Sequence, residues 1–141
     1  MNRKADLLVV EDNEDYIEFV KRAVSKINKD LVLDYVTDGK DAIDYFEKNA
    51  AQADSPAKLV IMDVNLPGMN GIQVLKKMRA MPQLKYIPVI MFSSSNNVND
   101  VKRSYDCGAN GYVVKPLGLN PLTETLQSIV DFWLGRNYFY N

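Results

Sequence analysis

The sequence predicts an α/β fold, a doubly wound five-stranded parallel sheet with helices on both faces. Short apolar runs alternate along the chain with longer segments whose apolar residues recur at helical spacing. The runs are almost continuously apolar, which is typical of parallel strands buried on both sides, and strict strand and helix alternation favours right-handed crossovers. At 141 residues the chain is long enough to bury one core without disulfides, so we expect a single domain.

Each expected strand is an apolar run bounded by polar or turn-forming residues. In chain order these runs cover residues 6–10, 31–36, 58–62, 87–92 and 111–114. A helix from about residue 14 to residue 28 follows the first run, where Asp12 and Asn13 offer N-capping oxygens. The expected fold therefore begins with a strand, a tight acidic turn and a helix.

The helices are recognised by apolar residues spaced three or four apart. These stripes are, in order, Ile17, Val20, Val24 and Ile27; Ala42, Ile43 and Phe46; Ile72, Leu75 and Met78; Val98, Val101 and Tyr105; and Leu122, Leu126, Ile129 and Trp133. The connections carry turn signals: Thr37-Asp38-Gly39, a polar segment at 49–57, a loop at 64–70 with Pro67-Gly68, and a helix stop at Gly108.

Composition excludes several kinds of chemistry. The chain contains no histidine, so it cannot use a histidine base, zinc ligand or phosphorylated donor of its own. The net charge is -1 with no long basic run, which argues against direct nucleic-acid binding. Cys107 is the single cysteine, and no apolar stretch has the length of a signal peptide or a membrane span. We therefore expect a cytoplasmic protein without membrane contact.

Chemically active side chains follow four of the predicted strands. They are Glu11 and Asp12, Asp63, Ser93, and Lys115. In an open parallel sheet, groups just past the carboxyl ends of the strands share one crevice. Three neighbouring carboxylates repel one another unless a cation neutralises them, and a lysine beside them suits an anion. The pattern indicates Mg²⁺-assisted phosphoryl transfer to a carboxylate.

These residues lie in the motifs VVEDN, MDVNLPGMNG, FSSS and GANGYVVKP, in that order. With them the chain resembles the receiver domain of two-component response regulators, from Leu7 to about Trp133. The stretches SYDCGANGYVVKP and DFWLG are also similar to the stand-alone regulators that serve bacterial phytochromes. The resemblance implies the flavodoxin-like receiver fold and a phosphoacceptor, not an enzyme with a separate substrate, that assists its own phosphorylation and dephosphorylation.

The resemblance implies a role for each acidic residue. Asp63 accepts the phosphoryl group as an acyl phosphate. Asp12, Asp63 and the backbone carbonyl of Asn65 hold Mg²⁺, for which Mn²⁺ can substitute. Glu11 stands where the family more often has aspartate, which leaves open whether it contacts the metal directly or through water. Asp12 taken alone could instead cap the first helix, and one side chain can serve both roles.

Three further residues receive roles by the same resemblance. Lys115 contacts the phosphoryl oxygens, with a cis peptide bond to Pro116. Ser93 donates its hydroxyl to the phosphoryl group, and the small Ser94 leaves room for a backbone N–H beside it. When Ser93 moves, Tyr112 is expected to rotate inward and change the surface of the fourth helix, fifth strand and fifth helix. Tyr112 as an ordinary half-buried aromatic is an open alternative.

We expect residues 1–141 to form one receiver domain with an aromatic tail at about 135–141 and no output domain. A sensor histidine kinase or a phosphotransfer protein would supply the phosphoryl group from phosphohistidine, and an unidentified downstream protein would read it or accept it in a relay. The tail, with Tyr138, Phe139 and Tyr140, either forms a homodimer or docking contact or folds back on the last helix, and both alternatives are open.

Other classes fit less well. An aspartyl phosphatase would need a second aspartate two residues after the nucleophile, where this chain has Asn65. A nucleotide-binding module would share the architecture, but neither GxGxxG nor GxxxxGK[ST] occurs. A receiver that binds partners without phosphorylation would be expected to lack part of the acidic set or Lys115.

Overall fold

The computed structural model describes residues 5–49 and 56–139. Its five strands form one parallel sheet in the order β2-β1-β3-β4-β5. They are β1 (Ala5–Val10), β2 (Leu33–Val36), β3 (Ala57–Asp63), β4 (Val89–Ser93) and β5 (Gly111–Val114). The expected fold class is confirmed, and β1, β3 and β4 occupy the buried centre of the sheet.

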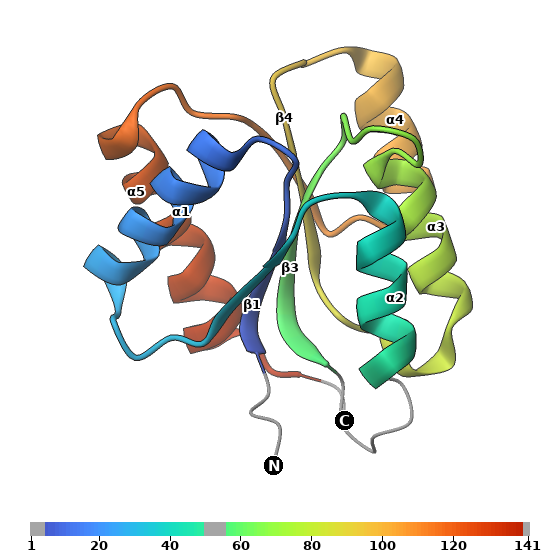
Figure 1. Cartoon of the computed structure of the whole chain (residues 1–141), viewed down its shortest axis with the longest axis horizontal. Helices are drawn as coiled ribbons and strands as arrows, with labels where there is room; N and C mark the ends of the chain where they lie inside the picture. Colours follow the sequence, from blue (N-terminus) through green and yellow to red (C-terminus); the bar gives the residue numbers. More distant parts are fainter. Residues whose placement is uncertain (1–4, 50–55, 140–141) are drawn as a thin grey trace.

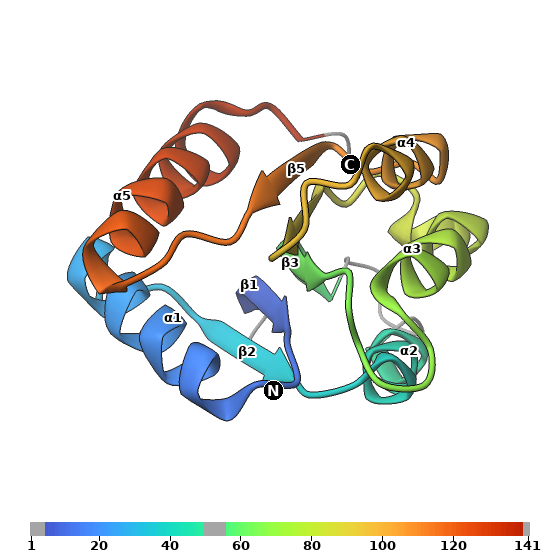
Figure 2. The ribbon, with the colours of Figure 1, turned by 90° about the horizontal axis from the view of Figure 1, so that it is seen from above.

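Helices cover both faces of the sheet (Figures 1 and 2). One face carries α1 (Glu14–Ile27) and α5 (Leu119–Val130), which pack side by side. The other carries α2 (Gly39–Asn49), α3 (Gly71–Ala80) and α4 (Val98–Asp106). Two short helical segments, η1 (Pro82–Leu84) and η2 (Asp131–Arg136), follow α3 and α5. In Figure 2 the sheet is seen from above, between the two helical layers.

The central strands contribute to two separate apolar clusters. Leu8 and Val10 of β1 pack with the cluster beneath α2, α3 and α4, whereas Leu7 and Val9 pack with the cluster beneath α1 and α5. All four side chains are buried. Burial on both faces explains why these strands are continuously apolar in the sequence instead of alternating.

Element boundaries differ from the sequence prediction by a few residues. The second strand begins at Leu33 instead of residue 31, although the N–H groups of Asp6 and Leu7 already bond the Val32 carbonyl. The last helix ends at Val130 and continues as the wider η2 turn, which carries Trp133. Most of the predicted connection at 49–57, and the last two residues of the tail, lie outside the described residues.

Two asparagine caps fix the loops that follow β1 and β3. The Asn13 side chain accepts a hydrogen bond from the Tyr16 N–H at 3.0 Å and starts α1. Asn70 and Gln73 form a reciprocal capping box that starts α3. At Gly71 a Cβ atom would lie 2.0 Å from the Asp63 carbonyl oxygen, so this position requires glycine. The loop after Asp63 is therefore held tightly against the end of β3.

Candidate functional site

Asp63 is the last residue of β3, and its side chain is nearly buried, with 5% exposed. One carboxylate oxygen, Oδ1, accepts a hydrogen bond from the Asn65 N–H at 3.0 Å. The other, Oδ2, accepts one from the Lys115 ammonium at 3.2 Å. The sheet and its loops therefore orient this carboxylate from both sides.

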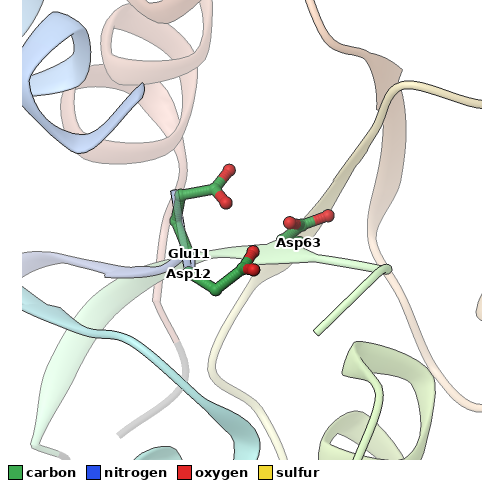
Figure 3. A group of neighbouring side chains, drawn as sticks. All are labelled: Glu11, Asp12 and Asp63. Atoms are coloured by element: carbon green, nitrogen blue, oxygen red, sulfur yellow. The ribbon is translucent and has the colours of Figure 1, made fainter. Parts of the chain in front are cut away.

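Glu11 and Asp12 directly follow β1 and lie next to Asp63, as Figure 3 shows. One carboxylate oxygen from each of the three residues lies within 4.8 Å of the other two. Glu11 is buried, and its Oε2 accepts a hydrogen bond from the Asn13 N–H at 3.1 Å. The predicted meeting of these carboxylates at one edge of the sheet is present in the structure.

The Asp12 side chain is the most accessible of the three and does not cap α1, because Asn13 does so. Desolvation of its carboxyl group and a hydrogen bond with Glu11 raise the pKa of Asp12 above its ordinary value. The ionised form of Asp12 is therefore less favourable here than in water, and the charge of Lys115 offsets only part of this effect.

Lys115 follows β5 and brings a positive charge into this cluster. Its ammonium group forms ion pairs with Glu11 and Asp63, and only 15% of its side chain is exposed. Burial opposes the charged form, but the hydrogen bond to Glu11 and the charge of Asp63 outweigh it and raise the pKa of Lys115. The lysine therefore stays protonated and points at the carboxylate of Asp63.

The expected cis peptide bond between Lys115 and Pro116 is wrong, because no described peptide bond is cis. Trans is the intrinsically favoured isomer by about 0.5–1 kcal/mol, a difference small enough for local packing to decide. With the bond trans, the Lys115 N–H donates to the Ser93 carbonyl at 2.8 Å. The ammonium group still reaches both of its carboxylate partners.

Ser93 ends β4 and is completely buried. Its Oγ accepts hydrogen bonds from the Ser95 N–H at 3.1 Å and from the Asn65 side chain at 3.4 Å. A hydroxyl accepts two bonds and donates one, so these contacts leave its hydrogen to donate. The neighbouring Ser94 is exposed.

Tyr112 of β5 lies half-buried against the cluster beneath α2, α3 and α4. Its hydroxyl donates a hydrogen bond to the Ser95 carbonyl at 2.9 Å. Because Ser95 is also bonded to Ser93, the three residues form a connected path from the site to β5. The inward rotation of Tyr112 stays a prediction.

One residue at this site was not predicted from the sequence: Tyr16, in the first turn of α1. Its ring centroid lies 4.7 Å from the Lys115 ammonium nitrogen. Among the described residues, its buried hydroxyl has no hydrogen-bond partner. Burial and the charges of Glu11 and Asp63 raise the pKa of Tyr16. No motif marks the position, because a tyrosine at the start of a helical stripe looks like ordinary packing.

This set of donor atoms fits a divalent metal ion that prefers oxygen ligands. Glu11, Asp12 and Asp63 offer only oxygen atoms, and Mg²⁺ takes carboxylate and carbonyl oxygens together with several waters. The partial exposure of Asp12 gives the cluster access to solvent. Neither histidine nor cysteine, the usual ligands of zinc, belongs to the group.

Aromatic rings in and just before the C-terminal tail are partly packed and partly exposed, and both alternatives for the tail stay predictions. Trp133 packs partly against the cluster beneath α1 and α5, and its ring meets that of Phe132 edge to face. Phe132 is 51% exposed, and Tyr138 is 98% exposed. The segment is therefore anchored by Trp133 and presents other aromatic rings to solvent.

Among the described residues, no helix is long and apolar enough to cross a membrane.

Taken together, the site combines a nearly buried carboxylate, two acidic neighbours suited to a cation, a lysine and a buried serine. A carboxylate can act as a nucleophile, and ammonium and hydroxyl groups can donate to anionic oxygens. These groups together have the chemistry needed to form and hold an acyl phosphate.

Comparison with known proteins supports this interpretation. The sequence model of the response regulator receiver domain matches residues 7–127. The chain is 31% identical to a probable methanogenesis regulatory protein, FilR2 of Methanothrix harundinacea, over 93% of this chain and 84% of that protein. It is 33% identical to response regulator Rcp1 of Synechocystis, over 91% of this chain and 88% of Rcp1.

Solved structures of related regulators have the same fold. The crystal structure of the phosphorylated cyanobacterial phytochrome response regulator RcpA matches with a TM-score of 0.88 and 31% identity, over 99% of this chain and 100% of RcpA. The Mn²⁺-bound form of Rcp1 matches with a TM-score of 0.83 and 31% identity, over 99% of this chain and 100% of Rcp1.

Proposed function

The chain belongs to the response regulator receiver domain family of two-component signalling, and we propose that its phosphoacceptor is Asp63. The observation that carries the proposal is the pair of contacts on its carboxylate. The Asn65 N–H holds Oδ1 and the Lys115 ammonium holds Oδ2, and the Asn65 side chain also bonds the buried Ser93 hydroxyl, so Asp63 is linked to both groups proposed to donate to the phosphoryl oxygens. Its near burial keeps competing water away.

We propose that Glu11, Asp12, Asp63 and the backbone carbonyl of Asn65 together hold Mg²⁺, with Mn²⁺ as a substitute. The carboxylate spacing and the oxygen-only donor set support this, as does the Mn²⁺-bound form of the related Rcp1. When bound, the ion neutralises the negative charge that gathers as a phosphoryl group approaches three carboxylates. The two hydrogen bonds on Glu11 favour its contact through water, because both of its oxygens are already engaged.

In the proposed reaction an Asp63 carboxylate oxygen attacks the phosphorus of a phosphohistidine on a partner protein. The P–O bond forms as the P–N bond breaks, and the histidine nitrogen keeps the electron pair. Lys115 transfers its ammonium hydrogen bonds toward the phosphoryl oxygens, and Ser93 donates its free hydroxyl hydrogen. The chain supplies no histidine, so the donor must be a sensor kinase or a phosphotransfer protein.

The same residues support the reverse fate of the phosphoryl group. Water that attacks the acyl phosphate restores the Asp63 carboxylate and releases phosphate. Asn65 stands at the position where an aspartate would act as acid or base in a phosphatase, and its amide cannot do so. We propose that hydrolysis is therefore slow compared with that of a turnover enzyme, and that the chain acts as a signalling acceptor.

Partner proteins would approach past the residues that rim the site. Leu117, directly after Pro116, is 90% exposed and offers a large apolar side chain next to Lys115. We propose that the phosphodonor contacts this position.

On the far end of α5, the exposed rings of Phe132 and Tyr138 are proposed to contact a second copy of the chain. The path from Ser93 through Ser95 to Tyr112 is proposed to signal phosphorylation to a downstream protein.

The metal requirement is the test of this function. The chain is incubated with acetyl phosphate and Mg²⁺, with Mn²⁺, or with a chelator, and intact mass is measured after rapid, mild-pH sampling. We expect the mass of one phosphoryl group with either ion and none with the chelator or in Asp63→Asn. No gain in mass with either ion, combined with no metal binding by the wild type, would instead indicate a phosphorylation-independent binding module.

A further inference from the structure

Tyr16 is fixed beside the acidic cluster by the start of α1. Its backbone N–H bonds the capping side chain of Asn13 at 3.0 Å, directly after Asp12 in the chain. Its ring packs at the edge of the cluster beneath α1 and α5. The position of this ring is therefore set by the same turn that sets Glu11 and Asp12.

The ring lies against the ammonium group of Lys115, with 4.7 Å between the ring centroid and the nitrogen. An aromatic face at this distance attracts a cation, and it does so more strongly when both groups are shielded from water. Only 15% of the lysine side chain is exposed. The ammonium thus has carboxylate partners in Glu11 and Asp63 and an aromatic face as a third contact.

The contact is made by the ring and not by the hydroxyl of Tyr16. Within residues 5–49 and 56–139, no acceptor or donor pairs with that hydroxyl, although it is buried. A buried hydroxyl without a partner lowers stability, and a phenylalanine would pack in the same way without this cost. The ring is held by apolar packing and by the cation beside it.

Without the Tyr16 ring, the Lys115 ammonium group would be able to adopt other positions. Glu14 and Asp15 lie in the same first turn of α1, and both are exposed acids. A lysine side chain is flexible and its ammonium is strongly hydrated, so loss of the ring beside it would allow rotation toward solvent or such acids. The ring of Tyr16 occupies the space next to the ammonium nitrogen.

We propose that Tyr16 is a positioning residue for Lys115, whose ammonium group it keeps aimed at Asp63 and at the phosphoryl group that arrives there. The inference rests on the proposed function of Asp63. Tyr16 itself touches no reacting atom and acts through the lysine, so its effect should disappear when the lysine is absent.

The test is a double-mutant cycle on the rate of phosphorylation by acetyl phosphate and Mg²⁺, followed by intact mass. In the wild-type background we expect Tyr16→Leu to slow the reaction by roughly 3- to 30-fold, the factor that corresponds to losing a partly buried cation–π contact. Tyr16→Phe keeps the ring and should react at nearly the wild-type rate. In a Lys115→Met background, Tyr16→Leu should cause no further loss beyond about twofold, because the two residues act as one unit.

A second measurement follows the contact itself and does not depend on the reaction. The ring current of an aromatic face shifts the NMR signals of the Lys115 Cε and Hε atoms, and this shift should be lost in Tyr16→Leu and kept in Tyr16→Phe. Thermal unfolding is measured for each variant, and Tyr16→Met replaces Tyr16→Leu if the latter is unfolded at the assay temperature.

Several results would overturn the inference. They are an equal loss in the Lys115→Met background, a Tyr16→Phe variant as slow as Tyr16→Leu, or a Tyr16→Leu variant as fast as the wild type. A wild type that gains no phosphoryl group would instead refute the function of Asp63, so the two failures are distinguishable.

Discussion

The hydroxyl of Tyr112 donates a hydrogen bond to the carbonyl oxygen of Ser95 across 2.9 Å, and so joins β5 to the loop that follows β4. The same Ser95 donates its N–H to Ser93, the buried serine beside Asp63. A change at Ser93 therefore has a direct route to Tyr112 through one shared residue. Whether Tyr112 is a switch or an ordinary half-buried aromatic depends on how much this bond responds to the phosphoryl group.

Tyr112→Phe tests that bond. We expect the free energy of unfolding of the unphosphorylated protein to fall by about 0.5–1.5 kcal/mol, the usual net contribution of a neutral hydrogen bond. Urea unfolding measures it, with Tyr105→Phe on the exposed side of α4 as the control, for which we expect a change within about 0.5 kcal/mol. The same loss in the presence of beryllofluoride, a phosphoryl mimic, would identify Tyr112 as ordinary packing.

Asp12→Asn should stabilise the metal-free protein at neutral pH. Because desolvation and Glu11 raise the pKa of Asp12 in the folded state, the folded state binds its proton more tightly than the unfolded state does. Below the unfolded-state pKa of 3.8, this proton contributes its full stabilisation to the fold. That contribution is lost as the pH rises through the folded-state pKa. At neutral pH the ionised Asp12 is therefore unfavourable, and the neutral amide removes that cost.

The measurement is the difference in unfolding free energy between Asp12→Asn and wild type, from pH 7 down to about pH 4, without metal. We expect the advantage of the variant to shrink as the pH falls. Added Mg²⁺ should raise the melting temperature of the wild type and have much less effect on the variant. Asp44→Asn, on the exposed face of α2, serves as the control. A metal response as large in Asp12→Asn as in wild type would remove Asp12 from the ligand set.

Arg79→Lys should destabilise the fold without touching the site. The Arg79 guanidinium donates to the carbonyls of Gly108, Leu84 and Ile87 and to the side chain of Asn110, at 2.8 to 3.0 Å. Burial lowers the pKa of Arg79, but these hydrogen bonds stabilise its charged form. A lysine cannot reach all of these acceptors, so we expect a loss of about 2–4 kcal/mol by urea unfolding. Lys77→Ala, exposed on the same helix, should change stability by less than about 0.5 kcal/mol, and an equally small effect of Arg79→Lys would contradict this view.

Replacing the exposed rings at the end of α5 tests the proposed self-association. Phe132 and Tyr138 are the large apolar side chains that this segment exposes most. If a second copy covers them, the double change Phe132→Ser and Tyr138→Ser should weaken dimerisation by about tenfold or more, as the loss of buried aromatic contacts commonly does. Sedimentation equilibrium measures the association. Tyr35→Ser on β2 controls for loss of any exposed ring, and a dimer equally weakened by both changes, or by neither, would rule out this contact.

Much of the fold was predictable because it depends on apolar patterns and strand ends that a single sequence shows. The continuous apolar runs of β1, β3 and β4 reflect burial on both faces, and the strand ends place Glu11, Asp63 and Lys115 at one edge. Those features follow from chain direction and burial alone.

What escaped prediction depends on side-chain geometry. Asn13 rather than Asp12 caps α1, and two adjacent capping residues cannot be ranked without the backbone path. The contact of Tyr16 with Lys115 joins residues far apart in the chain. The Arg79 guanidinium likewise joins α3 to residues 84–87 and to residues 108–110. The isomer of the Lys115–Pro116 bond was wrongly inferred, since a preference of about 0.5–1 kcal/mol is decided by local packing.

The most direct test of the central claim is to identify the residue that carries the phosphoryl group. The wild-type chain is phosphorylated with acetyl phosphate and Mg²⁺, and borohydride then reduces the acyl phosphate to the corresponding alcohol. Peptide mass spectrometry should find homoserine in place of aspartate at Asp63 and at no other carboxylate. Reduction at Glu11 or Asp12, or phosphorylated protein with Asp63 unchanged, would contradict the account.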